Sequence, residues 1–489
     1  MKVLEVFIKM FNKKFLKNLF GFSMINWIAF IIGFVSTLIL TRVYNPSELG
    51  AISIFISLTS VYQVTVSMGQ DQFIVRKYYE QENKEKLIST ILILELISWI
   101  ILMIITIFLS SFLSKLILGE INIFAVIATS VISLPLSLFR LITQISKLEN
   151  AIFEHGKQIL IFNLVSRIIV IGIGFINKDY NLYILCYSIV VFVISMLFFI
   201  KEIKKIKTNN HSKEKISCLD LKIAMNYGLP LMMASVMFMI KDLLPRVILR
   251  EEGTLHDVGI LGAAMTLASS INVVISGFNT YFSAYFFENY EEDKGQINVI
   301  HHMLVFVLVE SLIILSLFSG IISLLVGESF RDAGSIFPII AMFSISQVIS
   351  ETTVHGINVK EKTYLHIIIT LIALIAIYTC SILLVNKYGV LGISVSYSVG
   401  GLVFYFLRTI LGQKNYRNIN KIGVTHVVLV ITFLVSIFNH IYFNNYLLRF
   451  SVLIITGIII ALIYKQYINK FLKLLKILLQ KKREKSDDN

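Results

Sequence analysis

The chain has 489 residues, of which 56% are hydrophobic and only 15% are charged, and its mean hydropathy is +0.80. This composition excludes a soluble globular domain, because the apolar segments are too long for the helices of a soluble core. The net charge of +14 lies mainly in short loops between apolar segments, which is typical of an anionic inner leaflet nearby and argues against a nucleic-acid-binding protein.

Nothing in the sequence points to a cofactor, a metal ion or a removed signal. Cys186, Cys218 and Cys380 lack the paired spacing of a disulfide framework, and His301-His302 lacks the spacing of metal ligands. The first lysines are not followed by a small-residue cleavage site, so we expect no removed signal peptide. Because no nucleotide-binding loop is found, we expect no cofactor, and an ion gradient as the energy source.

Apolar segments long enough to cross a bilayer follow a basic first segment. Residues 1–20 carry five lysines among Phe, Leu and Ile, which predicts an amphipathic helix on the inner membrane surface, and the tail from Gln466 repeats this pattern. A membrane-spanning helix needs about 20 apolar residues. The sequence therefore predicts fourteen spans, at residues 24–41, 49–68, 88–110, 121–139, 158–176, 182–200, 226–249, 258–287, 299–326, 335–355, 364–385, 390–411, 424–443 and 447–464.

The positions of the basic residues support this number of spans. With both termini in the cytoplasm, most of the 44 Lys and Arg fall in cytoplasmic segments, as the positive-inside rule requires. Abundant Ile, Lys and Asn with few Pro indicate an AT-rich bacterial gene. We therefore expect a multi-pass protein of the bacterial plasma membrane with both ends inside. The basic residues outside the cytoplasm are Arg42, Lys115, Lys178, Arg250, Arg331, Lys387 and Arg449 on the exterior, and Arg167, Lys241 and Arg246 at membrane depth.

The two halves of the chain resemble each other. An offset of 208 to 210 residues relates Arg42 to Arg250, Gly69 to Gly277, Glu80 to Glu288, Leu49-Gly50 to Val258-Gly259, Asn177-Lys178 to Asn386-Lys387 and Tyr187-Ser188 to Tyr397-Ser398. This near-constant offset predicts a duplicated six-helix unit, and parallel repeats of that kind place a transport site between the two lobes. We predict an all-α membrane protein with an N-terminal lobe at 1–205, a C-terminal lobe at 206–411, and two further spans with a basic tail at 412–489.

Several segments resemble a known family in their order and spacing. They are LILTRVYNPSELGAISI (38–54), MGQDQFIVRKYYE (68–80), YGLPL (227–231), RVILREEGTLHDVGILGAA (246–264) and NKYGVLGISVSYSVGG (386–401). Together they resemble polysaccharide and O-antigen flippases of the multidrug, oligosaccharidyl-lipid and polysaccharide exporter superfamily. The resemblance implies transfer of undecaprenyl-pyrophosphate-linked sugars from the inner to the outer leaflet. Relatives often have Asp-Arg where this chain has Pro245-Arg246.

The seventh predicted span carries charge at membrane depth. Such charge costs a few kcal/mol or more, so it usually faces a water-filled cavity or a partner. Asp242, Arg246 and Arg250 follow one another at intervals of four, so one helical face holds all three. A pyrophosphate needs donors, and we predict that Arg246, with Lys241 next, contacts the substrate. The alternative is a structural ion pair in which Asp242 neutralises Arg246.

Three further arginines are candidate substrate contacts. Arg167 lies near the midplane of the fifth span. Arg42 and Arg250 occupy equivalent positions in the two repeats at the outer membrane edge, where the alternative to a gating role is a side chain that extends to the lipid headgroups.

Transport against a gradient needs a coupling ion, for which membrane carboxylates are the usual H⁺ or Na⁺ sites. Asp242 and Glu310 lie near the midplane, whereas Glu95 and Glu351 lie nearer the cytoplasm. We predict coupling at Asp242, Glu310 and Glu351. The alternative for Glu310, Glu95 and Glu351 is a hydrogen bond between helices, and Glu351 also has His355 four residues later as a possible partner.

We therefore predict a flippase that is not an enzyme and works by alternating access between the lobes, for surface polysaccharide of the O-antigen or capsule type. Its partners would be the lipid-linked oligosaccharide, a coupling ion and membrane lipids, without nucleic acid. One alternative is an exporter of drugs or other small molecules with the same fold, although cationic drugs favour net acid in the cavity. A membrane polymerase or glycosyltransferase is a weaker alternative. Such enzymes usually carry a large external loop, whereas no predicted external loop here exceeds about ten residues, the length of an ordinary connection.

Overall fold

In this computed structural model, the described residues are 13–81, 83–149, 151–209, 216–269, 282, 286–287, 294–360, 362 and 364–487. Every regular element in these ranges is a helix. The predicted amphipathic segment 1–20 lies mostly outside them, as does the second half of the predicted span 258–287. The prediction of an all-α protein is confirmed for the described ranges.

The first half of the chain forms long apolar helices joined by short connections. They are α2 (Lys13–Val43), α3 (Pro46–Ser67), α4 (Gln70–Lys77), α5 (Lys84–Leu118), α6 (Ile123–Leu148), α7 (Ile152–Ile176) and α8 (Tyr180–Asn209). The break between α3 and α4 falls at Met68 and Gly69, both left-handed, with φ of 46° and 68°. A left-handed pair ends the hydrogen-bonded ladder of α3, so α4 begins as a separate short helix.

The second half begins with α9 (Cys218–Glu252), a helix with two internal prolines, Pro230 and Pro245. The other helices are α10 (Leu255–Ala268), α12 (Lys294–Leu317), α13 (Ser319–Leu325), η1 (Glu328–Phe330), α14 (Arg331–Glu351), α15 (His355–Val359), α16 (Tyr364–Asn415), α17 (Ile422–Ile441) and α18 (Tyr446–Asp487). In the most apolar part of Glu328–Glu351, 94% of residues are buried, so η1 and α14 form the centre of this half.

The segment α16 consists of two antiparallel helices joined by a sharp kink. Gly389 interrupts it with a non-helical backbone, φ 51° and ψ −126°. A Cβ at Gly392 would lie 2.5 Å from the carbonyl oxygen of Leu384, and one at Gly400 would meet the side chain of Ile377. Residues before and after Gly389 therefore lie side by side in reverse order, so α16 provides the two predicted spans 364–385 and 390–411.

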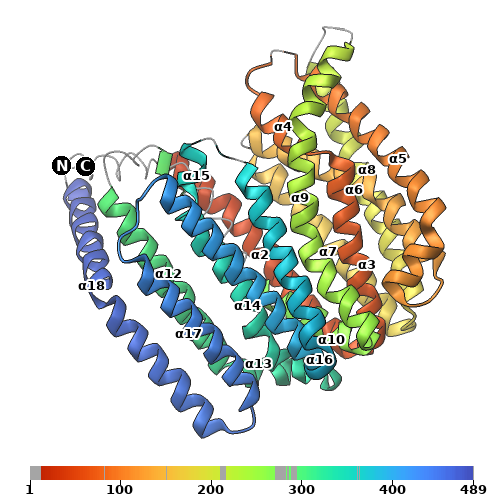
Figure 1. The fold of residues 1–489 in the computed structure, drawn as a ribbon. Helices are drawn as coiled ribbons and strands as arrows, with labels where there is room; N and C mark the ends of the chain where they lie inside the picture. Colours follow the sequence, from red (N-terminus) through yellow and green to blue (C-terminus); the bar gives the residue numbers. More distant parts are fainter. Residues whose placement is uncertain are drawn as a thin grey trace.

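In the described residues, 11 helices are long and apolar enough to cross a membrane. This number includes α16 as one helix, although its two halves are antiparallel. Two shorter apolar helices, Trp27–Val43 and Leu255–Ala268, coincide with the predicted first and eighth spans. A polytopic membrane protein is therefore confirmed, while the total of fourteen spans remains a prediction. Figure 1 shows that α2 begins and α18 ends on the same side of the molecule, as an even number of crossings requires.

The duplication predicted from the sequence has a counterpart in the local structure. At the start of α3, the Glu48 carboxylate accepts a hydrogen bond from the Asn45 backbone N–H at 3.0 Å. At the start of α10, Asp257 accepts from the Thr254 backbone N–H at 3.1 Å. Both are capping arrangements, and they lie 209 residues apart, the offset that relates Gly50 to Gly259.

We call α2–α8 the N-terminal bundle and α9–α16 the C-terminal bundle. Figure 1 shows them converging at the end where α10 lies, with α17 and α18 on the far side of the C-terminal bundle. The chief helix pairs that join the bundles are α3 with α10, and α9 with α3, α4 and α5. The division at residues 205 and 411 remains a prediction.

Candidate translocation site

A cavity of about 230 Å³ lies between the two bundles, where the middle of α9 faces α3, α10, α14 and α16. The first turns of α9 contact α4 and the start of α5, its middle contacts α16, and its last turn reaches the end of α5. The polar residues that line the cavity are Ser57 and Ser60 of α3, Lys241, Asp242 and Arg246 of α9, Thr266 and Ser269 of α10 and its end, Ser344 of α14 and Tyr397 of α16.

A charged cluster occupies one wall of this cavity. The Lys241 ammonium lies 2.7 Å from Asp242 Oδ1 and donates to the Tyr397 hydroxyl at 3.2 Å. The Tyr397 hydroxyl in turn donates to Asp242 Oδ1 at 2.7 Å. The ammonium also lies 4.5 Å and 4.9 Å from the ring centroids of Phe238 and Phe343. Lys241 is therefore held in place by a carboxylate, a phenol and two aromatic faces.

The Asp242 carboxylate forms an ion pair with Lys241, whereas Arg246 forms a hydrogen bond with a backbone carbonyl. Arg246 donates from Nη1 to the backbone carbonyl of Asp242, one turn earlier in α9. Arg246 Nε has no hydrogen-bond partner in the described part of the chain. Arg246 also lines the cavity, so a guanidinium with five N–H donors and an ammonium share one wall. The side chain of Asp242 is 40% exposed and that of Lys241 10%, so the carboxylate is the more accessible of the two.

The cavity also offers acceptors for hydroxyl groups. Ser57, Ser60 and Thr266 donate their hydroxyl protons to backbone carbonyls of their own helices, at 2.8, 3.0 and 2.9 Å. Their oxygen lone pairs stay available to accept from a bound molecule. These residues and Tyr397 were not among the site residues predicted from the sequence. The match of Tyr397 to Tyr187 between the predicted repeats was the one feature that pointed to Tyr397.

Arg167 lies in the N-terminal bundle and is not among the residues that line the cavity. Its side chain is half-buried, and its guanidinium lies over Gly33 of α2, where a Cβ would be 3.4 Å from Nη2. Its charge acts on the phenols of Tyr183 and Tyr187 in α8. Tyr187 is the repeat counterpart of Tyr397, so each bundle places a basic residue near the equivalent tyrosine.

Arg42 and Arg250 occupy equivalent helix ends but have different surroundings. Arg42 is exposed near the end of α2. Arg250 donates from Nη2 to the Leu116 carbonyl at 2.8 Å and from Nε to the Ile117 carbonyl at 3.3 Å, and it also bonds to the carbonyl of Lys115. The guanidinium thus binds carbonyls in the last turn of α5, a position that favours positive charge.

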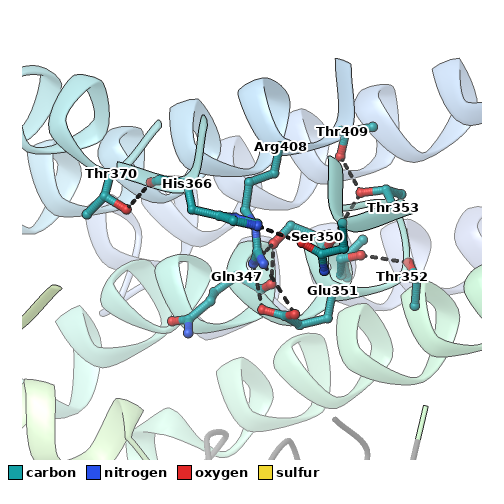
Figure 2. A network of polar contacts seen from close by, with 11 residues as sticks. Gln347, Ser350, Glu351, Thr352, Thr353, His366, Thr370, Arg408 and Thr409 are labelled. Carbon is teal, nitrogen blue, oxygen red and sulfur yellow. Dashed lines mark hydrogen bonds and ion pairs between the residues drawn. The ribbon is translucent and has the colours of Figure 1, made fainter. Parts of the chain in front are cut away.

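Glu351 forms a two-pronged ion pair with Arg408, on the α14–α16 interface and outside the cavity lining. Figure 2 shows Arg408 extending from α16 to the carboxylate at the end of α14. The Nη1–Oε1 and Nη2–Oε2 distances are 2.5 and 3.3 Å, and Nη1 also donates to Ser350 Oγ at 2.9 Å. The sequence analysis considered His355 as a partner, but the structure places its ring against Phe286, with the centroids 4.3 Å apart.

We expect Arg408→Ala to destabilise the protein by about 3 kcal/mol, because removal of one member of a buried pair leaves an unpaired charge. Thermal unfolding of the purified protein would measure this loss. Glu351→Gln combined with Arg408→Gln should recover more than half of it. If the double variant were as unstable as Arg408→Ala, the ion pair would not be the cause.

Glu310 lies far from the cavity-lining set, on the face of α12 that packs against α18. A Cβ at Gly457 of α18 would be 3.2 Å from Glu310 Oε2, so this glycine makes room for the carboxyl. Glu310 Oε1 has no hydrogen-bond partner within the described ranges. Of the three predicted coupling carboxylates, the structure brings only Asp242 into the cavity. Across the described residues, no cluster of His, Cys, Asp or Glu is placed to hold a metal ion.

The two bundles touch closely at the end where α3 and α10 begin. Gly50 and Gly259, the repeat counterparts, allow this approach, because a Cβ on Gly50 would collide with the Leu255 carbonyl and one on Gly259 with the Pro46 carbonyl. One turn further on, a Cβ at Gly262 would lie 2.8 Å from Ser53 Cβ. The cavity is therefore closed at this end by backbone packed on backbone.

Comparison with known proteins agrees with this architecture. A family model described as "Polysaccharide biosynthesis protein" matches residues 39–333. The solved structure of the lipid II flippase MurJ, in an inward closed conformation, is similar at a TM-score of 0.66 and 16% identity, over 91% of this chain and 99% of that chain. An inward-facing multidrug resistance MATE family transporter of the MOP superfamily is similar at a TM-score of 0.61 and 12% identity, over 80% and 97%.

At these identities the similarity concerns the fold, and no curated protein matches the sequence. The fold agrees with the one that the resemblance in the sequence implied. Because the matched segment covers more than half of the chain, the family resemblance noted in the sequence is confirmed: the chain belongs to the polysaccharide biosynthesis protein family.

Proposed function

We propose that the protein is a flippase that moves undecaprenyl-pyrophosphate-linked oligosaccharide across the bacterial plasma membrane for surface polysaccharide synthesis. The observation that carries this proposal is the cavity between the bundles, where the Arg246 guanidinium lies at one wall and serine and threonine hydroxyls line the others. A guanidinium binds phosphate oxygens through paired hydrogen bonds. The serine and threonine oxygens accept hydrogen bonds from sugar hydroxyls. The family's link to polysaccharide biosynthesis supports the same substrate class.

Alternating access follows from the close contact at one end of the bundles. In the predicted topology this end is external, so the present conformation would receive substrate from the cytoplasmic side. Separation of α3 from α10 would then open the cavity outward. Asp242 is the coupling carboxylate in this proposal, because an incoming cation would compete with Lys241 for it and so alter the charge presented to the substrate.

A second candidate is export of cationic small molecules. The exposed Asp242 carboxylate favours it, as does the fold shared with a multidrug transporter. Against it, the α9 wall carries two basic groups and one acidic group.

Reconstituted protein would separate the two candidates. We expect vesicles containing the protein to move a fluorescent undecaprenyl-pyrophosphate oligosaccharide to the opposite leaflet at least tenfold faster than protein-free vesicles, and to leave ethidium efflux unchanged, because the cavity is cationic. Ethidium transport without lipid transfer would contradict the flippase proposal.

A further inference from the structure

Glu95 is a buried carboxyl in the N-terminal bundle that the proposed transport site does not use. It lies on α5 and its side chain is 1% exposed. Glu95 Oε2 has no hydrogen-bond partner, and no ion pair involving this residue occurs within the described ranges. The Ser137 hydroxyl of α6 lies beside the carboxyl but does not complete a hydrogen bond of normal geometry.

A carboxylate in such a place is very costly. Transfer of an unpaired charge into an apolar interior costs so much that the group usually takes up a proton instead. Within the described ranges no cation lies at ion-pairing distance from Glu95, and its 1% exposure leaves solvent unable to offset that cost. It therefore carries its proton in this conformation.

The charged groups that face Glu95 come from two neighbouring helices. They are Asp71 of α4 and Arg140 of α6. These two are already paired, with Arg140 Nη2 2.7 Å from Asp71 Oδ2, and Gln72 donates to the same oxygen at 3.3 Å. The cation that the described residues place near Glu95 is thus engaged, and an ionised Glu95 would compete with Asp71 for it.

The residues just before Asp71 hold α9. A Cβ on Gly69 would lie 2.5 Å from the Gly228 carbonyl oxygen, and Gln70 donates from Nε2 to the Ala224 carbonyl at 3.1 Å. Both contacts are made with the first half of α9, whereas Asp242 and Arg246 lie in its second half. A change in the Asp71–Arg140 pair would therefore act on a segment that packs against the helix carrying the cavity charges.

We propose that Glu95 is a proton-binding site of the transport cycle. This proposal rests on one part of the proposed function, the rearrangement of the two bundles during transport. With the proton bound, Arg140 stays on Asp71 and α4 holds α9. When a rearrangement of the bundles admits water to Glu95, the O–H bond releases its proton to that water. The resulting carboxylate then draws Arg140 away from Asp71, and the α4–α9 contact loosens.

The stability arm of the test uses the purified full-length protein. The folded state keeps a proton that an unfolded glutamate releases above a pH of about 4.3, so the unfolding temperature should fall as pH rises from there. Glu95→Gln, a neutral copy of the protonated side chain, should flatten this slope. Glu154→Gln is the matched control, because Glu154 is exposed and lies 3.2 Å from Lys201, and it should leave the slope unchanged.

The transport arm uses lipid transfer driven by an imposed pH gradient in vesicles. Glu95→Gln should reduce the response to the gradient by about tenfold or more, in the range of typical coupling free energies. A flat stability slope with normal gradient-driven transfer would contradict a coupling role, and an unchanged slope would contradict proton binding. If wild type itself transferred no lipid, the proposed function would fail, whereas the stability arm would still report on Glu95.

If Glu95→Gln does not accumulate, Glu95→Asp replaces it and the carboxyl is titrated by infrared spectroscopy. A protonated-carboxyl band that shifts between wild type and Glu95→Asp supports the proposal. The absence of such a band contradicts it.

Discussion

Arg246→Ala is expected to abolish surface polysaccharide while the protein stays at its normal level in the membrane. The guanidinium lies at the cavity wall with Nε unpartnered, and its bond to the Asp242 carbonyl is made within its own helix. Among the described residues, its removal therefore breaks no hydrogen bond between helices. It does remove the fork of donors that a pyrophosphate needs, so we expect a loss of about 100-fold or more in transfer rate, equivalent to about 3 kcal/mol.

Arg246→Lys separates charge from geometry, because lysine keeps the charge but loses the paired donors. We expect it to restore a small part of the transfer. Arg167→Ala is a useful comparison, since Arg167 lies over Gly33 and outside the cavity lining. Immunoblotting of membranes controls for protein level, and surface polysaccharide is measured on the same cells. Normal polysaccharide in Arg246→Ala would remove this residue from the substrate site.

Gly259→Ala is expected to stop transport by preventing closure between α3 and α10. The added methyl would collide with the Pro46 carbonyl, a backbone atom that cannot move aside as a flexible side chain can. The closed state is therefore raised in free energy relative to the open one, and a shift of about 1.4 kcal/mol already changes their ratio tenfold. We expect less than a tenth of wild-type transfer.

The control is Gly172→Ala, because a Cβ at Gly172 meets nothing within 4 Å. It should transport normally. A cysteine at Ser53, placed in a chain whose three native cysteines are replaced, reports the state of the closure, since Ser53 packs against Gly262. We expect an impermeant maleimide outside the cell to label it in Gly259→Ala and not in the otherwise wild-type chain. Protection in both chains would contradict the role assigned to Gly259.

Much of the architecture was predictable because a bilayer imposes strong constraints on sequence. Backbone polar groups must be satisfied within each segment, so apolar runs of sufficient length become helices. Helix length alone does not give the number of spans. Two antiparallel helices joined at Gly389 form the single element α16, and α10, which ends at Ala268, covers only the first part of the predicted eighth span. The repeat offset identified Gly50 and Gly259 as counterparts but did not reveal that they face each other.

The candidate site was only partly predictable. Charge within α9 marked Lys241, Asp242 and Arg246, and these three do line one cavity. Spacing alone favoured Asp242 as the partner of Arg246, whereas the structure pairs it with Lys241 through a contact completed by Tyr397, 155 residues away. In the same way, Glu351 pairs with Arg408 of α16 rather than with His355, four residues later in the chain.

The sequence by itself determined that this is a helical membrane protein and which helix carries charge, and it predicted an internal repeat. These properties follow from local composition and from short-range spacing. Only the tertiary structure decided which charged groups lie near one another. In the structure, Arg250 contacts the end of α5, Glu310 lies beside α18, and Glu95 is buried inside the N-terminal bundle. The reason is that the cost of a buried charge depends on the groups around it, and those come from helices far apart in the chain.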